Sequence, residues 1–324
     1  MIVVTGGAGF IGSAVVWRLN QLGEDNIVIV DRLGESEKWK NLVGLKYADF
    51  FHKDSFIDMV LENAVPFQVE AVIHLGACSS TTEKDADYLM HNNFKYTQAL
   101  AEYSLEKGVR FIYASSAATY GDGSAGYDDD ESKLDDLRPL NMYGYSKHLF
   151  DLYAKREGLL NRIAGLKYFN VYGPNEYHKG DMRSVVHKAF GQIKETGKVK
   201  LFKSYKPEYK DGEQMRDFIY VKDAVDMTLF FLENKNVNGL FNVGTGKART
   251  WNDLVTAIFA AMDKPVNIEY IDMPENLRNK YQYFTQAGMN KLLAAGYGKE
   301  ISGIEKGVED YVKNYLLTDK TLAW

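Results

Sequence analysis

A tyrosine and a lysine four positions apart form the pair in this sequence that is best suited to acid–base chemistry. Tyr143 and Lys147 belong to the run YGYSK, and in a helix they would lie on one face. A free phenol has a pKa of about 10 and is a poor base at neutral pH. Because a neighbouring ammonium group stabilises the phenolate, this spacing indicates a tyrosine that accepts and returns a proton.

The same spacing occurs at Tyr103 and Lys107, and the surrounding sequence distinguishes the two pairs. Tyr143 follows an apolar run, RFIYAS, that ends at Ser115, and the hydroxyl of Ser116 could bind a substrate oxygen there. Tyr103 precedes that run, on a helix that is expected to pack against a sheet. We therefore interpret Tyr103 and Lys107 as a surface pair.

A glycine-rich turn near the start of the chain predicts a cofactor for this chemistry. Residues 1–31 parse as strand, turn, amphipathic helix and strand, and the second strand ends at Asp31. The glycines of the turn contain the pattern G-x-G-x-x-G; they are Gly6, Gly7, Gly9 and Gly12. Such a turn lets a pyrophosphate approach backbone N–H groups at a helix N-terminus, so it predicts a dinucleotide site. An oxidised nicotinamide there would also favour the Tyr143 phenolate, and Lys147 could hold its ribose hydroxyls.

Strands and helices alternate through the first half of the chain. Apolar runs predict strands at residues 2–4, 27–30, 45–48, 69–75, 110–115 and 163–169. Helical spacing predicts helices at about 11–22, 56–63, 87–107 and 141–156, and the acidic run 128–131 is interpreted as a solvated loop. This order is typical of an α/β fold, a Rossmann-type doubly wound parallel sheet.

The pattern loosens beyond Val171, which predicts a smaller, discontinuous α/β substrate-binding lobe. A helix is expected near 182–195, and the segment 250–324 is expected to be mostly helical. The run RDFIYV at 216–221, a helix from about Asp223 and a strand at 239–243 predict a return to the sheet. We expect a Rossmann domain at 1–171 with a return at about 215–246. The substrate lobe would comprise 172–214 and 247–324, with the active cleft between the two parts.

Composition argues against several other classes of function. The chain has 324 residues, 45% of them hydrophobic and 26% charged, and its net charge of -5 gives no reason to expect nucleic acid or an anionic membrane as partner. No stretch approaches the ~20 apolar residues of a membrane span. The single Cys78 excludes an internal disulfide framework and offers no zinc cluster, so no metal is expected. The chain begins directly on its first strand, which leaves no room for a signal peptide and predicts a cytoplasmic protein.

Together these motifs resemble the extended short-chain dehydrogenase/reductase family, or NAD-dependent epimerase/dehydratase family. The matching segments are TGGAGFIG (5–12), Asp31, YASSAATYG (113–121), YGYSK (143–147), YFNVYGP (168–174) and RDFIYVKD (216–223). Further signatures are similar to the branch of the family that epimerises an ADP-linked heptose at C6″; they are GACSSTTE (76–83), HKGDM (178–182), LFKS (201–204) and RNKYQYFTQA (278–287). The resemblance implies transient oxidation of the sugar to a ketone, in the supply of heptose for the lipopolysaccharide core.

The resemblance implies four catalytic positions. Ser116, Tyr143 and Lys147 match a catalytic triad, and Lys179 matches a second acid/base. A second base makes chemical sense, because a hydride that returns to the other face of a ketone requires the oxygen to be served from two orientations. On the sequence alone Lys179 would instead be a solvated loop lysine.

The resemblance also implies a tightly bound NADP, with NAD as the alternative. Asp31 alone would suit the free ribose 2′-hydroxyl of NAD, whereas Arg32, Lys38 and Lys53 match a phosphate-neutralising set. Arg32 replaces an expected asparagine, and its guanidinium can serve a phosphate equally well. The full set of cofactor positions is Gly6, Gly9, Phe10, Ile11, Gly12, Asp31, Arg32, Lys38, Lys53, Leu75, Gly76, Ala77, Cys78, Ser79, Asn92, Tyr143, Lys147, Val171 and Lys179.

The positions that match contacts to an ADP-sugar substrate lie mostly in the second lobe. They are Ser116, Asn170, Asp181, Lys188, Phe202, Lys203, Ser204, Tyr205, Arg216 and Tyr281. Lys188 stands where a histidine is expected, and the segment 205–214 is longer than the family pattern. The resemblance further implies a homo-oligomer, a pentamer.

Three other activities compete with this interpretation. A nucleotide-hexose 4-epimerase would use the same machinery and is the main alternative. A 4,6-dehydratase needs acids after the hydroxyl of Ser116, and Ala117 and Ala118 occupy those positions. A catalytically silent NADP sensor would need the glycine turn but would have no use for Ser116, Tyr143 and Lys147.

Overall fold

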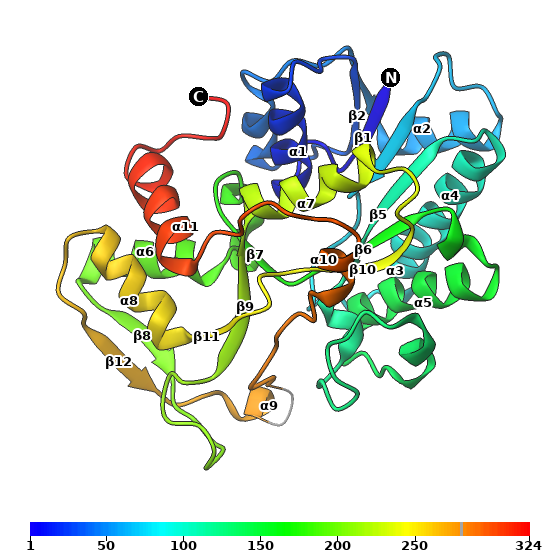
Figure 1. The fold of residues 1–324 in the computed structure, drawn as a ribbon. Coiled ribbons are helices and arrows are strands. Elements are labelled where there is room, and N and C mark those ends of the chain that lie inside the picture. Colours follow the sequence, from blue (N-terminus) through cyan, green and yellow to red (C-terminus); the bar gives the residue numbers. More distant parts are fainter. Residues whose placement is uncertain (279–280) are drawn as a thin grey trace.

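A seven-stranded parallel sheet forms the centre of the molecule (Figure 1). The structure is a computed structural model, and it describes residues 1–278 and 281–324. The strands lie in the order β10-β6-β5-β4-β1-β2-β3 and every neighbouring pair is parallel. Their bounds are β1 (Ile2–Thr5), β2 (Ile27–Asp31), β3 (Asp49–His52), β4 (Ala71–His74), β5 (Arg110–Ser116), β6 (Ala164–Tyr168) and β10 (Gly239–Val243). The expected doubly wound sheet is confirmed.

Helices flank this sheet, which explains the apolar composition of its strands. Every residue of β1, β2, β4, β6 and β10 is buried, as expected for strands covered on both faces. The helices of this part are α1 (Phe10–Gln21), α2 (Lys53–Leu61), α3 (Ala86–Leu89), α4 (Tyr96–Glu106), α5 (Met142–Arg156) and α7 (Val221–Glu233). Helix α1 packs on α7, and α2 packs on α4; Figure 1 places α4 and α5 together at the right.

Most of the remaining elements form a smaller region, at the left and lower left of Figure 1. It contains a three-stranded sheet of order β11-β9-β7 and a two-stranded parallel sheet of β12 and β8. The strands are β7 (Asn170–Tyr172), β8 (Val199–Phe202), β9 (Met215–Tyr220), β11 (Ala248–Thr250) and β12 (Ile268–Ile271). The helices are α6 (Val185–Thr196), α8 (Trp251–Ala261), α9 (Glu275–Arg278), α10 (Asn290–Ala294) and α11 (Ile304–Tyr311). Helix α8 packs against both α6 and α11, whereas α10 packs against β10.

Strand β3 was predicted in the wrong place. The sequence favoured residues 45–48, where Leu45 and Ala48 are apolar, but the strand is Asp49–His52. It is an edge strand that pairs only with β2, and its first and last side chains are exposed. An edge strand does not need a continuous apolar run, so the hydrophobic pattern pointed to the wrong segment.

The predicted return to the central sheet is only half correct. Strand β10 pairs with β6, as expected, but β9 pairs with β7 and β11 in the smaller sheet. Five of the six residues of β9 are buried. The run RDFIYV therefore predicted a strand correctly, but such a run carries no information about which neighbouring strand supplies the hydrogen bonds.

The segment after 250 is much less helical than expected. Residues 281–289 form neither a helix nor a strand, and Tyr283, Thr285 and Ala287 bond to β9. The backbone N–H of Met215 donates to Tyr283 O at 2.8 Å, and Thr285 N donates to Met215 O at 3.3 Å. The carboxylate of Asp217 then accepts from Ala287 N at 3.0 Å. Asn279 and Lys280, which belong to the 278–287 signature, lie outside the described residues.

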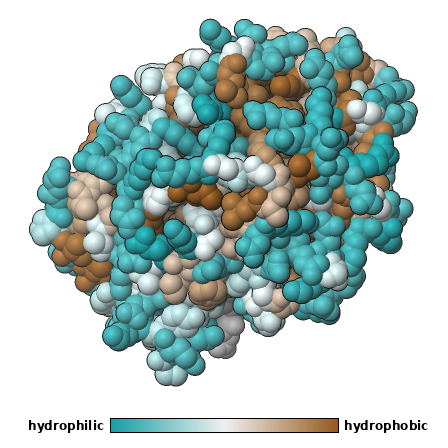
Figure 2. Space-filling model, in the orientation of Figure 1, coloured by the Kyte–Doolittle hydropathy of each residue, from teal (hydrophilic) through white to brown (hydrophobic). Residues whose placement is uncertain are grey.

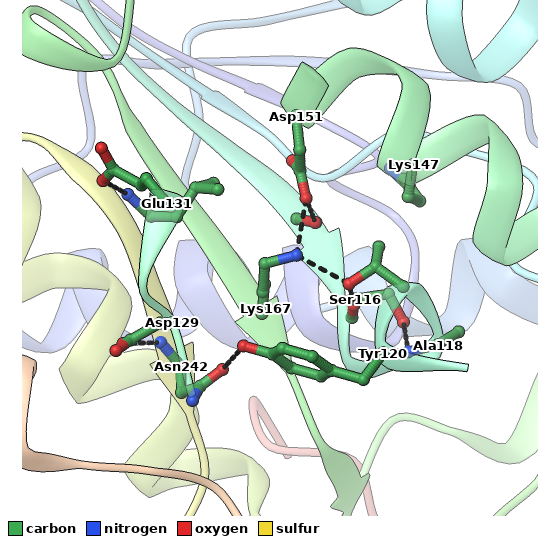
Figure 3. Close-up of polar contacts among 12 residues, drawn as sticks. Ser116, Ala118, Tyr120, Asp129, Glu131, Lys147, Asp151, Lys167 and Asn242 are labelled. Atoms are coloured by element: carbon green, nitrogen blue, oxygen red, sulfur yellow. Dashed lines mark hydrogen bonds and ion pairs between the residues drawn. The ribbon is translucent and has the colours of Figure 1, made fainter. Parts of the chain in front are cut away.

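The acidic run 128–131 is not a solvated loop, because two of its carboxylates bind the edge of the central sheet (Figure 3). Asp129 is buried and accepts from Asn242 N at 2.8 Å, and Glu131 accepts from Leu240 N at 2.8 Å. Strand β10 is the edge strand here, and its outward N–H groups need acceptors. The charge run therefore caps the sheet edge.

The segment predicted as a helix at 87–107 is helical as far as Glu106, and its middle part is a π-helix. Helix α3 leads through the π-segment Met90–Lys95 into α4. Asn93, buried in the π-segment, accepts from Cys78 N and donates to Cys78 O, both at 2.9 Å. π-Turns frequently accompany functional sites, and this one fixes the loop that follows β4.

The face of the molecule in Figure 2 is mainly hydrophilic, with apolar patches around a central hollow. Within 1–278 and 281–324, no helix is both long and apolar enough to cross a membrane.

Candidate active site

The glycine turn between β1 and α1 leaves room for backbone alone. Gly6 has φ +67°, and a Cβ there would lie 2.7 Å from Gly76 N. A Cβ at Gly12 would collide with the carbonyl oxygen of Gly6. Helix α1 begins after Gly9 without a side-chain cap, so its first N–H groups are available to an anion. The turn therefore fits a pyrophosphate at close range.

A cleft follows the carboxyl ends of β1, β2 and β4 and contains almost every position predicted to bind the cofactor. Two adjoining pockets form it, and of the predicted set only Val171 lies elsewhere, in a third pocket next to them. The residues after β4, including Ala77 and Cys78, line both pockets of the cleft. The structure thus places the predicted cofactor positions, which are far apart in sequence, along one continuous surface.

The wall near Asp31 is arranged for a phosphate as well as a ribose. Asp31 accepts from Ala8 N at 2.9 Å and forms an ion pair with Lys38 at 2.6 Å. Arg32, Lys38 and Lys53 line the same pocket, where Lys53 also pairs with the exposed Asp54. The charge of Asp31 is therefore balanced by Lys38, and two further cations face the space beside it.

Helix α5 carries the predicted acid–base pair into the cleft. The Asn141 side chain caps the helix by accepting from Gly144 N at 2.8 Å. A Cβ at Gly144 would lie 2.7 Å from Ala118 O, so this glycine lets α5 approach the turn that follows β5. Tyr143 consequently lines the cleft, and it shares the adjoining pocket with Ser116 at the end of β5.

Burial shifts both members of this pair away from the charged state. The pKa of Lys147 is lowered to about 8 by burial, and its ammonium donates to Ala114 O at 2.8 Å. The pKa of Tyr143 is raised by burial, a shift that the side chain of Ser116 partly offsets. In the protein by itself, the support that Lys147 gives to the phenolate does not outweigh this burial. The desolvation of the ring dominates, and a further positive charge is required.

Lys179 lines the same cleft, but it comes from another segment of the chain, which follows β7. It lies in the 3₁₀ turn Tyr177–Met182, and its ammonium is 5.4 Å from the centroid of the Phe10 ring. It lines both of the pockets that Tyr143 lines. Burial lowers the pKa of Lys179, and the buried carboxylate of Glu176 acts in the opposite direction. A partly desolvated lysine of this kind can act as a base nearer to neutral pH.

A third pocket continues from these residues toward the smaller region. Ser116, Tyr143, Asn170 and Lys179 line it, together with Trp251 at the start of α8. Trp251 joins this pocket to a cluster of predicted substrate residues. Its Nε1 donates to the hydroxyl of Tyr281 at 2.9 Å.

The guanidinium of Arg216 packs against two aromatic rings, those of Trp251 and Tyr281. The guanidinium of Arg216 lies 5.6 Å from the centroid of the Trp251 ring and 5.3 Å from that of Tyr281. The ring of Phe202 meets Tyr281 edge-on at 6.3 Å. Arg216 is buried and its pKa is lowered by that burial. Three predicted substrate positions are therefore brought together, beside the pocket and not inside it.

Five other predicted substrate positions do not line the pocket that contains Ser116, Tyr143 and Lys179. Lys203 and Tyr205 both bind the exposed carboxylate of Asp272, at 3.2 Å and 3.1 Å. Ser204 N donates to Asp211 at 2.7 Å, within the long segment 205–214. Lys188 and Asp181 are both exposed; the ammonium of Lys188 binds the backbone oxygen of Asp181, and neither residue lines a pocket described above.

Arg183 lines the third pocket and was not predicted. Its Nε is buried and, within the part of the chain that the structure describes, finds no hydrogen-bond partner. The residue directly precedes Ser184, which caps α6 by accepting from His187 N at 3.3 Å. An arginine between the HKGDM run and a Ser-capped helix was the available signal. Trp251 was also missed, because no local pattern links position 251 to position 216.

A network of buried polar side chains lies behind the acid–base pair (Figure 3). Asp151 on α5 and Lys167 on β6 form an ion pair at 2.8 Å, with 0% and 1% of their side chains exposed. Lys167 also donates to Thr119, in the turn after β5, at 2.6 Å. No sequence motif indicated this pair.

Comparisons with known proteins agree with this geometry. ADP-L-glycero-D-manno-heptose-6-epimerase of Nitratidesulfovibrio vulgaris is 62% identical over 98% of both chains, and that of Fusobacterium nucleatum is 53% identical over 98% of both. The crystal structure of the Helicobacter pylori ADP-L-glycero-D-manno-heptose-6-epimerase matches 97% of this chain and 95% of its own, with a TM-score of 0.80 and 28% identity. A UDP-glucose 4-epimerase from Thermotoga maritima, with UDP-glucose, covers 98% of this chain and 99% of its own, with a TM-score of 0.79 and 26% identity. Residues 2–244 match the model of the NAD dependent epimerase/dehydratase family. The chain belongs to the NAD dependent epimerase/dehydratase family.

Proposed function

We propose that this protein epimerises ADP-D-glycero-D-manno-heptose at C6″ to ADP-L-glycero-D-manno-heptose, for the heptose of the lipopolysaccharide core. The observation that carries the proposal is the shared pocket of Ser116, Tyr143 and Lys179, which continues from the glycine-turn cleft. If the ketone is reduced on its other face, the sugar oxygen needs proton transfer from two directions. Tyr143 and Lys179 could provide it, because they line the same pockets from different segments of the chain. Relatives with the corresponding printed name, at 62% and 53% identity, support the choice of substrate.

Bound NADP would supply a reversible hydride acceptor and a positive charge beside Tyr143. The protein's own part begins with Ser116, whose hydroxyl donates a hydrogen bond to the oxygen on C6″. Tyr143 takes the hydroxyl proton as the carbonyl forms. Lys147, largely protonated below its pKa of about 8, favours the phenolate and holds the ribose hydroxyls of the nucleotide.

Lys179 serves the second half of the reaction. For the return step the ketone would present its other face, and its oxygen would then point away from Tyr143 and toward the 3₁₀ turn that carries Lys179. The ammonium of Lys179 then donates the proton that restores the hydroxyl. Because burial lowers the pKa of Lys179, this residue releases a proton more readily than an exposed lysine does.

The choice of NADP over NAD rests on the cations around Asp31. Lys38 balances the carboxylate at 2.6 Å, and Arg32 and Lys53 line the same pocket. A carboxylate without that balance would repel a 2′-phosphate. The diphosphate of the ADP-sugar would meet Arg216, which the rings of Trp251 and Tyr281 hold in place.

The division into parts, the assembly and the compartment extend the same proposal. Residues 1–171, with the return at about 215–246, would bind the nucleotide, and residues 172–214 and 247–324 would bind the sugar. A cytoplasmic homo-oligomer, a pentamer, agrees with the family resemblance. Light scattering of the purified protein would measure its mass, and a monomer would contradict the assembly.

A substrate panel tests the activity. Purified protein is incubated with the ADP-heptose, UDP-glucose and a dTDP-linked hexose, and the products are separated by stereochemistry at C6″ and C4″. We expect turnover of the ADP-heptose with inversion at C6″. Turnover of UDP-glucose alone would favour the 4-epimerase instead. Nucleotide released by denaturation should be NADP, and release of NAD alone would refute that part.

A further inference from the structure

The carboxylate of Asp151 is the centre of a fully buried polar network (Figure 3). It accepts from the hydroxyl of Tyr113 at 2.8 Å and from that of Ser115 at 2.7 Å, both on β5. Lys167 on β6 completes its shell as an ion pair at 2.8 Å. One side chain of α5 therefore binds two neighbouring strands of the central sheet.

The network continues from Lys167 to the backbone that carries the substrate-binding hydroxyl. The ammonium of Lys167 donates to Thr119 Oγ1 at 2.6 Å, and Thr119 donates to the carbonyl oxygen of Ser116 at 2.8 Å. The same ammonium lies 4.9 Å from the centroid of the Tyr120 ring. A continuous path of hydrogen bonds thus joins α5 to the end of β5.

Stability alone does not account for such a pair. Removing two charges from water is costly, and well-packed apolar residues of similar volume are often as stable or more so. A buried ionic network is useful where it specifies one geometry. Here the geometry concerns the acid–base residues, since Lys147 lies one helical turn from Asp151 and Tyr143 lies two turns away, on the same face of α5.

The charge of Asp151 also acts on Lys147. Burial lowers the pKa of Lys147 to about 8, and Asp151 is the largest influence in the opposite direction. The other groups that face Lys147 come from β4 and the loop after it. Cys78 would also raise the pKa of Lys147 if ionised, and the buried His74 is kept neutral because burial and Lys147 lower its pKa.

We propose that Asp151 and Lys167 are positioning residues of the active site: they align Tyr143 and Lys147 on α5 with Ser116 on β5, and keep Lys147 cationic. This inference rests on the proposed function, which gives Lys147 its role in turnover. Neither residue touches the cleft, so both act through the residues that do.

The test replaces the pair by uncharged side chains of similar size, Asp151→Asn with Lys167→Met. The alkaline limb of the kcat profile should move to lower pH by about half a unit or more, because Lys147 loses the charge that supports its proton. A half-unit shift of a pKa of about 8 lowers kcat at pH 8 about twofold, and misalignment of the pair should lower it further, with KM for the ADP-sugar little changed. A profile and a kcat that superpose on those of the wild type would overturn the proposal.

A second ion pair of the central sheet serves as the matched control. Lys291 and Glu131 lie 2.8 Å apart at the outer edge of β10, and neither lines the cleft. The double variant Glu131→Gln with Lys291→Met should lose stability without any displacement of the pH profile. An equal displacement in this control would show that the effect is structural, and would overturn the proposal.

One further variant keeps the inference testable if the double variant does not fold, and a binding measurement separates it from the proposed function. Thr119→Val removes only the hydroxyl between Lys167 and Ser116, and should lower kcat several-fold; an unchanged kcat would count against the network. The pH dependence of NADPH binding, followed by nicotinamide fluorescence, reports on Lys147 without turnover, and Thr119→Val should leave it near that of the wild type. If the wild type does not turn over the ADP-heptose, the proposed function fails. The binding measurement on the double variant still decides this one, because an unshifted profile would refute it.

Discussion

Three ionisable side chains meet in the cleft, and burial opposes the charged state of each. The pKa of Tyr143 is raised, whereas those of Lys147 and Lys179 are lowered. The positive charge of an oxidised nicotinamide beside Tyr143 would favour its phenolate, which could then accept a proton while the ammonium of Lys179 donates one. Substitutions that remove one polar group and keep the bulk of the side chain can assign these roles.

Tyr143→Phe removes a hydroxyl and keeps the ring. The side chain lines the cleft, so the fold and the melting temperature should remain near those of the wild type. Turnover should fall by about 10²–10⁴-fold, the usual contribution of a general acid–base group. Steady-state assays and a thermal melt check both parts. Near-normal turnover would place the base elsewhere, and an unfolded variant would mean that the hydroxyl is structural.

Lys179→Met keeps the length of the side chain and removes its charge. The variant should bind NADP and the ADP-sugar but epimerise very slowly, and its combination with Tyr143→Phe should be close to silent. Lys194→Met, at an exposed position on α6, is the control and should behave as the wild type. Binding is measured by calorimetry and turnover by product analysis. If Lys179→Met turns over within a few-fold of the wild type while Tyr143→Phe does not, one base is enough.

The 3₁₀ turn Glu37–Leu42 carries Lys38, through which we propose that the protein favours NADP over NAD. Lys38 points inward to Asp31, whereas Lys40 pairs with Glu37, and both members of that pair are exposed. Two lysines of one short turn therefore face opposite environments, which provides an experiment with its control on the same element.

Lys38→Ala should weaken NADP binding far more than NAD binding. The loss of a charge-assisted contact of about 1.5–3 kcal/mol corresponds to roughly 10- to 100-fold in affinity, and it leaves Asp31 without its counter-ion. Lys40→Ala should change neither affinity. Calorimetric titration of nucleotide-free protein with each cofactor measures the ratio, and an equal loss for NADP and NAD would exclude a contact to the 2′-phosphate.

At the scale of the whole molecule, His74 makes the stability of the fold depend on pH. Its ring lies at the end of β4, bonded to Thr5 at 2.6 Å and to Thr97 at 2.8 Å, and fully buried. Burial holds the pKa of His74 well below its usual value. The unfolded chain takes up a proton near pH 6.5 that the folded chain refuses, so stability is lost as the pH falls below that value.

The free energy of unfolding should therefore decrease between pH 7 and pH 5. The contribution of this histidine approaches about 1.4 kcal/mol per pH unit below its unfolded pKa. His74→Gln should be less stable at pH 7 and show a flatter pH dependence. His178 and His187, whose pKa values burial lowers to about 4, keep part of the slope in both proteins. Denaturant titrations across this range compare the two curves, and parallel curves would show that His74 does not contribute.

Much of the site was predictable because its motifs are local. The strand–turn–helix of residues 1–31 depends on backbone room at Gly6 and Gly12, and glycine alone provides that room. The spacing of Tyr143 and Lys147 depends on the period of one helix. Apolar runs likewise located the buried strands of the central sheet, although the edge strand β3 escaped because half of its side chains are exposed.

Tertiary structure alone decided the features that depend on a distant partner. Strand β9 has the burial of a central strand, yet it pairs with β7 and β11. No periodic pattern in the sequence predicts that Arg183 lines a pocket or that Asp151 pairs with Lys167. A helix or a turn is specified by neighbours along the chain, which the sequence lists in order. A strand partner or a buried counter-ion is specified by proximity in space, and this arises only when segments far apart in sequence pack together.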